Sequence, residues 1–266
     1  MQPLFFATVF DLKLIIIKTI ILNFIKMKIA KILTSFLIIT ILSTSQAFAQ
    51  KVSGKGGVIS EKIDLPTLTG VGLGIAANVY VKQGSSQEIT IKGQKNIIDN
   101  IKREVSNGTW SIEFEKEVKN HESIKIYITL KTLEDVSIGG SGSIIGEGKF
   151  TNLGNLDIAI GGSGDIKLDV DAKDINCSIG GSGEIHLEGS GDDLAISIGG
   201  SGDIEAYDLS VRKCEISSAG SGDINVNVSE RLDVSMVGSG DVSYKGDPKI
   251  SKSIVGSGDV ERAGSK

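Results

Sequence analysis

The tripeptide Gly-Ser-Gly recurs along the second half of the chain at a nearly constant step. Seven copies follow one another at intervals of 22, 19, 19, 20, 18 and 18 residues, and an acidic residue directly follows six of them; an eighth copy, Gly189-Ser190-Gly191, falls off this period. The first glycines of these copies are Gly140, Gly162, Gly181, Gly200, Gly220, Gly238 and Gly256. Such a period is typical of solenoid proteins, in which each repeat forms one coil that stacks on its neighbours.

Apolar residues keep fixed places around each of these glycines. In one copy, Leu194, Ile196 and Ile198 precede Gly200 at every second position, and the residues between them are small or polar. The residue four places after the glycine is isoleucine or valine in all seven copies. This period of two predicts short strands with one buried face on both flanks of a glycine turn.

We therefore predict an all-β fold, a single-stranded, right-handed parallel β-helix (solenoid) with coils of about 18–22 residues. The glycines would form a tight corner, where a Cβ would clash or the backbone needs a positive φ. The alternative is an antiparallel meander with Gly-Gly-Ser-Gly hairpin turns, in which equivalent residues would not point the same way in every copy. Lys252 replaces an apolar inward residue in the last copy, as expected of a terminal repeat.

The two cysteines provide a test of the stacking. Cys177 and Cys214 both fall at inward positions, two coils apart. Two layers of about 4.8 Å would separate their Cα atoms by roughly 10 Å. Because a disulfide needs less than about 7 Å, we predict two buried free thiols.

The N-terminal residues have the features of an export signal. In residues 27–49, Lys28 and Lys31 precede the apolar run 32–42, and Ala47 and Ala49 form an A-x-A cleavage site. We interpret residues 1–26 as an over-extended start; the alternative is a transmembrane hairpin formed by two short apolar runs. The pattern predicts an exported protein, periplasmic or at the cell surface, whose mature chain does not span the membrane.

Residues 50–133 lack the Gly-Ser-Gly period but are rich in alternating segments. These segments are 79–81, 89–91, 110–114 and 124–130, with a candidate short helix at 97–105 and a tight-turn signal at 107–108. We interpret this region as an N-terminal β-rich cap with the first coils. No linker separates it from the repeat region 134–266, so both are expected to form one domain.

The order of several motifs resembles a known family. Ile89-Thr90-Ile91-Lys92-Gly93 is followed by Asn107-Gly108-Thr109-Trp110 and by a strand that runs into Ile138-Gly139-Gly140-Ser141-Gly142. This order is similar to the head GIN domain family, a domain of unknown function described as auto-transporter adhesins. The resemblance implies a β-helix-like envelope or secreted protein, common in Bacteroidetes-type bacteria. It brings no catalytic residues and no cofactor.

The acidic residues after the glycine turns form a first candidate site. If they stack at about 4.8 Å, a hard cation such as Ca²⁺ could bridge neighbouring carboxylates. The alternative is that each side chain accepts local backbone N–H bonds and stays hydrated. The residues of this acidic column are Asp165, Glu184, Asp203, Asp223, Asp241 and Asp259.

A column of serines forms the second candidate, an interaction face. Small hydroxyl side chains at one outward position of each coil would make a flat, polar strip for a protein, a glycan or another copy. The alternative is that serine is merely tolerated on an exposed face. The serine column comprises Ser137, Ser178, Ser197, Ser217, Ser235 and Ser253.

Several function classes are disfavoured by the sequence. Without residues 1–49 the chain has 23 basic and 32 acidic side chains, and an acidic surface argues against nucleic acid as a partner. His121 and His186 lie in different regions, with no partner nucleophile or zinc spacing. We therefore predict a non-enzymatic binding or adhesin-like module without cofactor. The alternatives are a structural envelope solenoid and a polysaccharide-acting enzyme.

Overall fold

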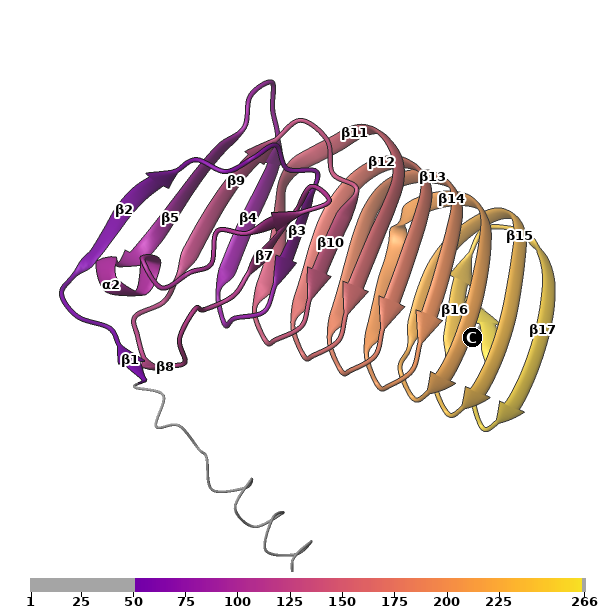
Figure 1. The fold of residues 1–266 in the computed structure, drawn as a ribbon. Coiled ribbons are helices and arrows are strands. Elements are labelled where there is room, and N and C mark those ends of the chain that lie inside the picture. Colours follow the sequence, from indigo (N-terminus) through magenta and orange to yellow (C-terminus); the bar gives the residue numbers. More distant parts are fainter. Residues whose placement is uncertain (1–50, 265–266) are drawn as a thin grey trace, which may run out of the picture. The chain divides into compact units, whose positions relative to one another are not determined.

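The computed structural model describes residues 51–264, which form one compact unit of stacked β-coils (Figure 1). The coils make about seven turns. The predicted all-β parallel solenoid is therefore confirmed. The signal peptide at 27–49, with Ala47 and Ala49, lies outside the described residues.

The repeat region is built from nine strands, of which β11 to β15 each follow most of one coil. They are β10 (Asp135–Ile138), β11 (Ser143–Ile160), β12 (Asp165–Ile179), β13 (Glu184–Ile198), β14 (Asp203–Gly220), β15 (Ile224–Gly238), β16 (Val242–Lys245), β17 (Lys249–Gly256) and β18 (Val260–Arg262). Every pairing among them is parallel, and like residues pair: Ile160 with Ile179, and Ile179 with Ile198. The parallel register excludes the antiparallel meander.

Neighbouring coils approach most closely at the glycine corners. A Cβ on Gly162 would lie 2.1 Å from the carbonyl oxygen of Gly140, and one on Gly164 would lie 2.4 Å from that of Gly142. The same two oxygens accept backbone N–H bonds of 3.1 Å from Ser163 and Asp165. In the periodic copies from Gly162 onward, both glycines of Gly-Ser-Gly are therefore required by backbone packing.

The inward columns form one continuous apolar core. Leucine, isoleucine and valine stack on one another from coil to coil, and nearly all of them are fully buried. Cys177 and Cys214 belong to this core, each 2% exposed, and both are free thiols, as predicted. Cys177 stacks on Ile196 and Cys214 on Leu194, so an apolar residue of β13 lies beside each sulfur.

Residues 51–133, the described part before the repeat region, contain nine shorter strands and one short helix; we call them the N-terminal part. They are β1 (Val52–Ser53), β2 (Val58–Ile63), β3 (Gly70–Leu73), β4 (Asn78–Gln83), β5 (Glu88–Gln94), α2 (Lys95–Ile98), β6 (Val105–Ser106), β7 (Thr109–Ile112), β8 (Val118–Asn120) and β9 (Lys125–Leu130). Strands β3 and β4 pair with β10 and β11 on one side and with β7 and β9 on the other. The spatial order of the first coils therefore differs from their order in the chain.

Of two local predictions for the N-terminal part, the turn at 107–108 is confirmed and the helix at 97–105 is not. Asn107 and Gly108 both have positive φ and join β6 to β7 in a two-residue hairpin, which confirms the predicted turn. The helix predicted at 97–105 is wrong in its extent, because α2 ends at Ile98. Ile101 instead bridges to Phe114, so antiparallel pairing with a later segment overrides local helix propensity.

The last coil leaves its inward side partly open. Ile250 of β17 is 40% exposed, whereas its counterparts in earlier coils are buried. Lys252 replaces an apolar inward residue, and its ammonium group donates to the carbonyl oxygen of Val260 at 3.3 Å. Its alkyl chain therefore reaches from β17 toward β18, with the charge at the end of the stack.

Two adjacent glycines give a matched test of the corner geometry. A Cβ on Gly181 would lie 2.0 Å from the Gly162 carbonyl oxygen, whereas one on Gly180 would come no closer than 4.0 Å to any atom. Gly181→Ala should destabilise the fold by about 3 kcal/mol or more, because two coils must separate. Gly180→Ala should be neutral or stabilising by up to about 1 kcal/mol, because alanine reduces unfolded-chain entropy. Urea unfolding measures both; equal effects would contradict the corner geometry.

The core also contains one polar defect. Ser218 is 3% exposed, its hydroxyl has no hydrogen-bond partner, and it pairs in register with Ile198 and Met236. Ser218→Ala should stabilise the protein by about 1 kcal/mol, because it removes an unsatisfied buried hydroxyl. The exposed neighbour Ser217→Ala is the control and should change stability by less than about 0.5 kcal/mol. A lower thermal midpoint for Ser218→Ala would show that the hydroxyl is satisfied.

Candidate interaction face

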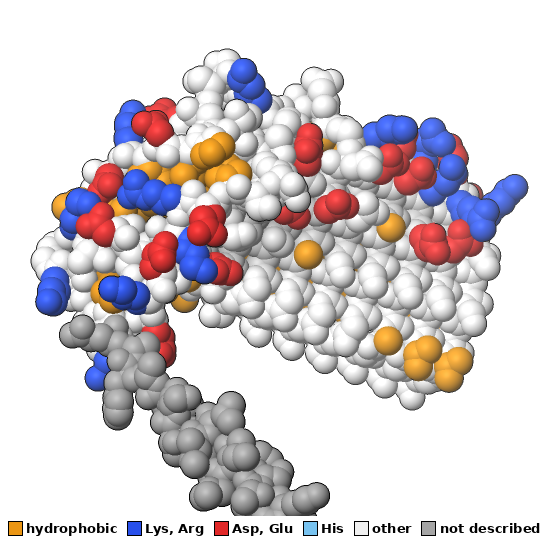
Figure 2. All heavy atoms as spheres, in the orientation of Figure 1, with side chains coloured by type: hydrophobic (Ala, Val, Ile, Leu, Met, Phe, Trp, Pro, Cys, Tyr) orange, Lys and Arg blue, Asp and Glu red, His pale blue; other side chains and the backbone are white. Residues whose placement is uncertain are grey.

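One side of the solenoid is a flat sheet with almost no long side chains. It is formed by β7, β3, β10, the second halves of β11 to β15, and β17, which follow one another in parallel register. Figure 2 shows this flat face as a broad surface largely free of charged and apolar side chains. Three outward columns run along it, one residue per coil.

The serine column lies along the middle of the flat face. The predicted serines are all in register, with Ala159 in the one repeat coil that lacks a serine. Ser137 is half-buried and the other five are exposed. Ser111 of β7 and Gly72 of β3 continue the column beyond the repeat region. The structure therefore brings the predicted serines together in one straight strip.

A column of small residues, the glycine column, lies beside the serines. The sequence analysis did not predict it as part of the interaction face. It consists of Gly139, Gly161, Gly180, Gly199, Ala219, Val237 and Val255. A Cβ at any of its four glycines would find no atom closer than 3.9 Å, and none of these glycines has a positive φ. The fold therefore does not require glycine here. The signal was present in the sequence, because the first glycine of Gly-Gly-Ser-Gly is absent from the last three copies.

The glycine column changes character at the C-terminal end of the flat face. Val237 and Val255 pair in register and are 56% and 65% exposed. Figure 2 shows hydrophobic side chains gathered at this end, next to the last glycine corners. The flat face therefore has a bare, polar stretch that ends in a small apolar patch.

The third outward column, the polar column, carries the acidic side chains of the flat face. Asn176 donates to Asp157 at 2.7 Å, and Arg231 binds the Asp233 carboxylate with two nitrogens, at 2.5 and 3.2 Å. Partial burial, helped by the charge of Asp157, raises the pKa of Asp135, although a hydrogen bond from Thr109 opposes this. The polar column consists of Asp135, Asp157, Asn176, Ala195, Glu215, Asp233 and Ser251.

A hollow opens where this polar column is interrupted by Ala195. A cavity of about 660 Å³ lies between the polar column and a ridge of charged residues that includes Asp193 and Lys213. An adjoining cavity of about 380 Å³ extends over the serines. Asn176, Ala195 and Glu215 line both. The opposite wall of the larger cavity includes Asp193 and Lys213. The hollow therefore joins the flat face to the ridge.

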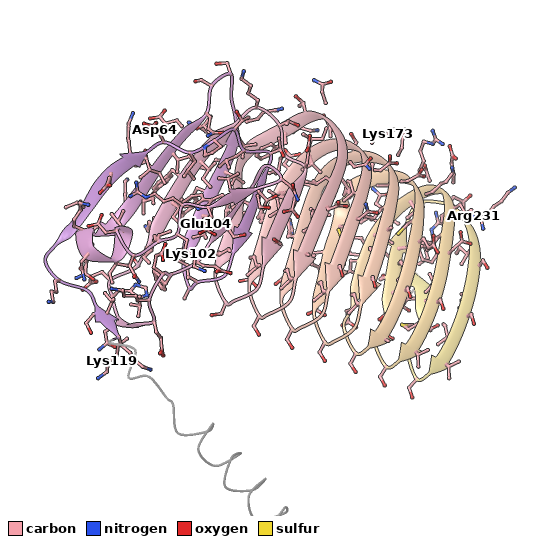
Figure 3. The ribbon with its side chains drawn as sticks, in the orientation of Figure 1. Asp64, Lys102, Glu104, Lys119, Lys173 and Arg231 are labelled. Carbon is pink, nitrogen blue, oxygen red and sulfur yellow. The ribbon has the colours of Figure 1, made fainter. Side chains whose placement is uncertain are left out.

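The charged ridge borders the flat face along its upper edge. Arg212 contacts Asp192 at 3.6 Å and Glu230 at 3.2 Å, and so links three successive coils. Lys173 and Arg231 project from this edge, above the short side chains of the flat face (Figure 3). These ion pairs are exposed, so each contributes little to stability, but they give the face a charged border.

The backbone N–H groups of the acidic column donate hydrogen bonds to the preceding or neighbouring coil. The backbone N–H of Asp223 donates to the Asp203 carboxylate at 2.8 Å, and Asp241 and Asp259 repeat this contact at 3.0 and 2.9 Å. The N–H groups of Asp165, Glu184 and Asp203 instead donate to glycine carbonyls of the preceding coil. Among residues 51–264, no three His, Cys, Asp or Glu side chains form a group that could hold a metal ion. The geometry therefore favours coil-to-coil bonding over calcium.

The candidate catalytic groups are scattered. His186 lies 3.0 Å from the Glu188 carboxylate on the other broad sheet, and His121 lies in a loop against the carbonyl oxygen of Glu122. Burial raises the pKa of Cys177 to about 12 and also raises that of Cys214, which leaves both thiols protonated. The structure therefore does not bring either histidine to a cysteine of the core.

Comparison with known proteins assigns the family. The model of the family described as "Putative auto-transporter adhesin, head GIN domain" matches residues 67–248. The chain belongs to this family. The match includes the flat face from β3 to β15, and it confirms the resemblance found in the sequence.

Solved structures support the same assignment. A "putative adhesin" from Bacteroides fragilis is 30% identical, with a TM-score of 0.75 over 79% of this chain and 99% of the other. A "putative lipid binding protein" from Parabacteroides distasonis is 28% identical, with a TM-score of 0.67 over 80% and 100% of the two chains. No curated protein was found to match the chain.

No helix in the described part of the head GIN chain is long and apolar enough to cross a membrane.

The buried thiols yield a chemical prediction. With a pKa of about 12, only about one Cys177 thiol in ten thousand is ionised at pH 8, and the thiolate is the reactive form. Iodoacetamide should therefore label neither cysteine of the folded protein at pH 8 within an hour, and both after unfolding in urea. Mass spectrometry of the intact protein counts the labels. Rapid labelling of the folded protein would contradict the burial of these residues.

Proposed function

We propose that this protein is an exported, non-catalytic binding module of the cell envelope, which uses its flat face to contact a partner. Export is supported by the signal-peptide pattern of residues 27–49. A binding role is supported by the adhesin family and by the adhesin relative from Bacteroides fragilis. The partner class is a protein or glycan at the cell surface, with a second copy of the chain as the other candidate.

The glycine column carries this proposal. Four successive coils keep glycine at an exposed position where a side chain would fit without a clash. Each of these glycines directly follows the end of a strand, and glycine loses more conformational freedom on folding than any other residue, so its retention costs stability that folding does not require. A backbone without side chains lets a partner approach closely. A role in partner binding would therefore explain why glycine is kept in spite of the lost stability.

The serine column would provide the polar contacts. Serine presents a donor and acceptor at each coil, and its short side chain loses little rotamer freedom on binding. Coils spaced about 4.8 Å apart offer these groups at a regular interval, which suits an extended or repetitive partner. The apolar pair of Val237 and Val255 would add a hydrophobic contact at one end.

Charged side chains on the flat face should abolish binding. We expect Ser178→Arg/Ser217→Arg to reduce retention of the partner at least tenfold, because two long cations would hold any flat surface away from the glycine column. The assay immobilises the purified protein and measures capture from an envelope extract and on a glycan array.

A matched control has the same charge change on the other sheet. Asn225 and Ser243 are outward residues that pair in register there, so Asn225→Arg/Ser243→Arg should bind as wild type does. Thermal midpoints of all three proteins verify folding. Equal retention by both variants, or no retention by the wild type, would refute a binding role for the flat face.

A further inference from the structure

Two tyrosines stack on the outer side of the N-terminal part, on the sheet opposite to the flat face. Tyr80 of β4 and Tyr127 of β9 pair in parallel register, and their rings are 5.0 Å apart and nearly parallel, at 14°. Each alternates with fully buried residues, so both rings face outward and are half-buried. Among the described residues these are the two aromatic rings that stack face to face, although only 5% of the chain is aromatic.

The tyrosine pair forms one wall of a small hollow. The hollow has a volume of about 230 Å³, and its lining includes Tyr80, Lys82, Glu88, Lys92, Tyr127 and Glu147. Residues from β4, β5, β9 and β11 therefore meet there. Its volume is below the range of about 300–1,000 Å³ that is usual for drug-sized ligands. The hollow suits a ligand of about one six-membered sugar ring.

Charged side chains contact one another and the tyrosine rings around this hollow. The Lys92 ammonium group lies 4.8 Å from the centre of the Tyr127 ring, and Tyr127 in turn stacks on Tyr80. Glu88 is bound by Lys62 at 2.5 Å; this hydrogen bond, with the Lys62 charge, lowers the pKa of Glu88. These contacts place a lysine and a glutamate at the border of the hollow, beside the tyrosine rings.

The lining groups are those that recognise a neutral saccharide. Within residues 51–264, neither tyrosine hydroxyl has a hydrogen-bond partner, and Glu147 forms no ion pair. These groups and Lys82 offer acceptors and donors for sugar hydroxyls, and the tyrosine rings offer an apolar wall for ring C–H groups. Lys82 and Lys92 line the hollow together with Glu88 and Glu147, and Lys62 binds Glu88, so charges of both signs are mixed and no cluster of cations alone faces the ligand.

We propose that the hollow between Tyr80, Tyr127 and Glu147 is a binding site for one pyranose unit of a neutral saccharide. The exposed edges of the two stacked tyrosine rings contact the carbon face of the sugar, and Glu147 and Lys82 bond its hydroxyl groups. The site lies on a different sheet from the flat face and does not depend on the function proposed for that face.

The test is a titration of the purified protein with methyl glycosides of neutral hexoses and N-acetylhexosamines, followed by saturation-transfer NMR. Inorganic phosphate and a methyl uronide form separate arms. At least one neutral glycoside should give signals at millimolar concentration, and Tyr80→Ala and Glu147→Gln should each weaken that binding at least tenfold. The charged arms should bind no more tightly.

Tyr207 provides a matched control on the same solenoid. Its ring is also half-buried under a lysine, with Lys245 at 4.5 Å, but it has no stacked partner and lines none of these hollows. Tyr207→Ala should leave glycoside binding unchanged, as should Ser178→Arg/Ser217→Arg on the flat face. Binding that survives both Tyr80→Ala and Glu147→Gln would overturn the proposal, as would stronger phosphate binding or no glycoside binding at all.

Discussion

The solenoid depends on the close approach of successive backbones at the glycine corners. Carbonyl oxygens of one coil accept N–H bonds from the next, at distances that leave no space for a Cβ. Once two coils are fixed there, the strands that leave the corner are in register, and like residues stack along both sheets. The apolar core, the serine column and the acidic column all follow from that register.

The repeat region was predictable because each of its properties is local and repeated. Alternation around Gly200, read in seven copies, specifies which residues are inward, and stacking specifies that Cys177 and Cys214 cannot meet. The N-terminal part was less predictable, because its pairings join segments far apart in the chain. Strand β3 lies between β7 and β10, and Ile101 extends toward Phe114 instead of continuing a helix. No local pattern encodes either contact.

The candidate sites divide in the same way. The serine column was found from the sequence because one position recurs in nearly every coil. The glycine column was misread, because a glycine needed for close packing, such as Gly181, stands next to Gly180, which is not needed for it. Tyr80 and Tyr127 gave no signal, since only the pairing of β4 with β9 places their rings together. The free space around a glycine and the pairing of distant strands depend on the three-dimensional structure, so neither can be read from a local sequence pattern.

The direction of the coil-to-coil hydrogen bonds has a mechanical consequence. These bonds run along the solenoid axis, so a pull between its two ends loads them a few at a time, starting at an end coil. Strand β17 is held by β15 on one side alone, and Lys252 adds contacts to Asp259 and Val260 in the neighbouring segment. Under tension such a module would peel coil by coil from this end and lengthen gradually, so that it dissipates force instead of rupturing in one step.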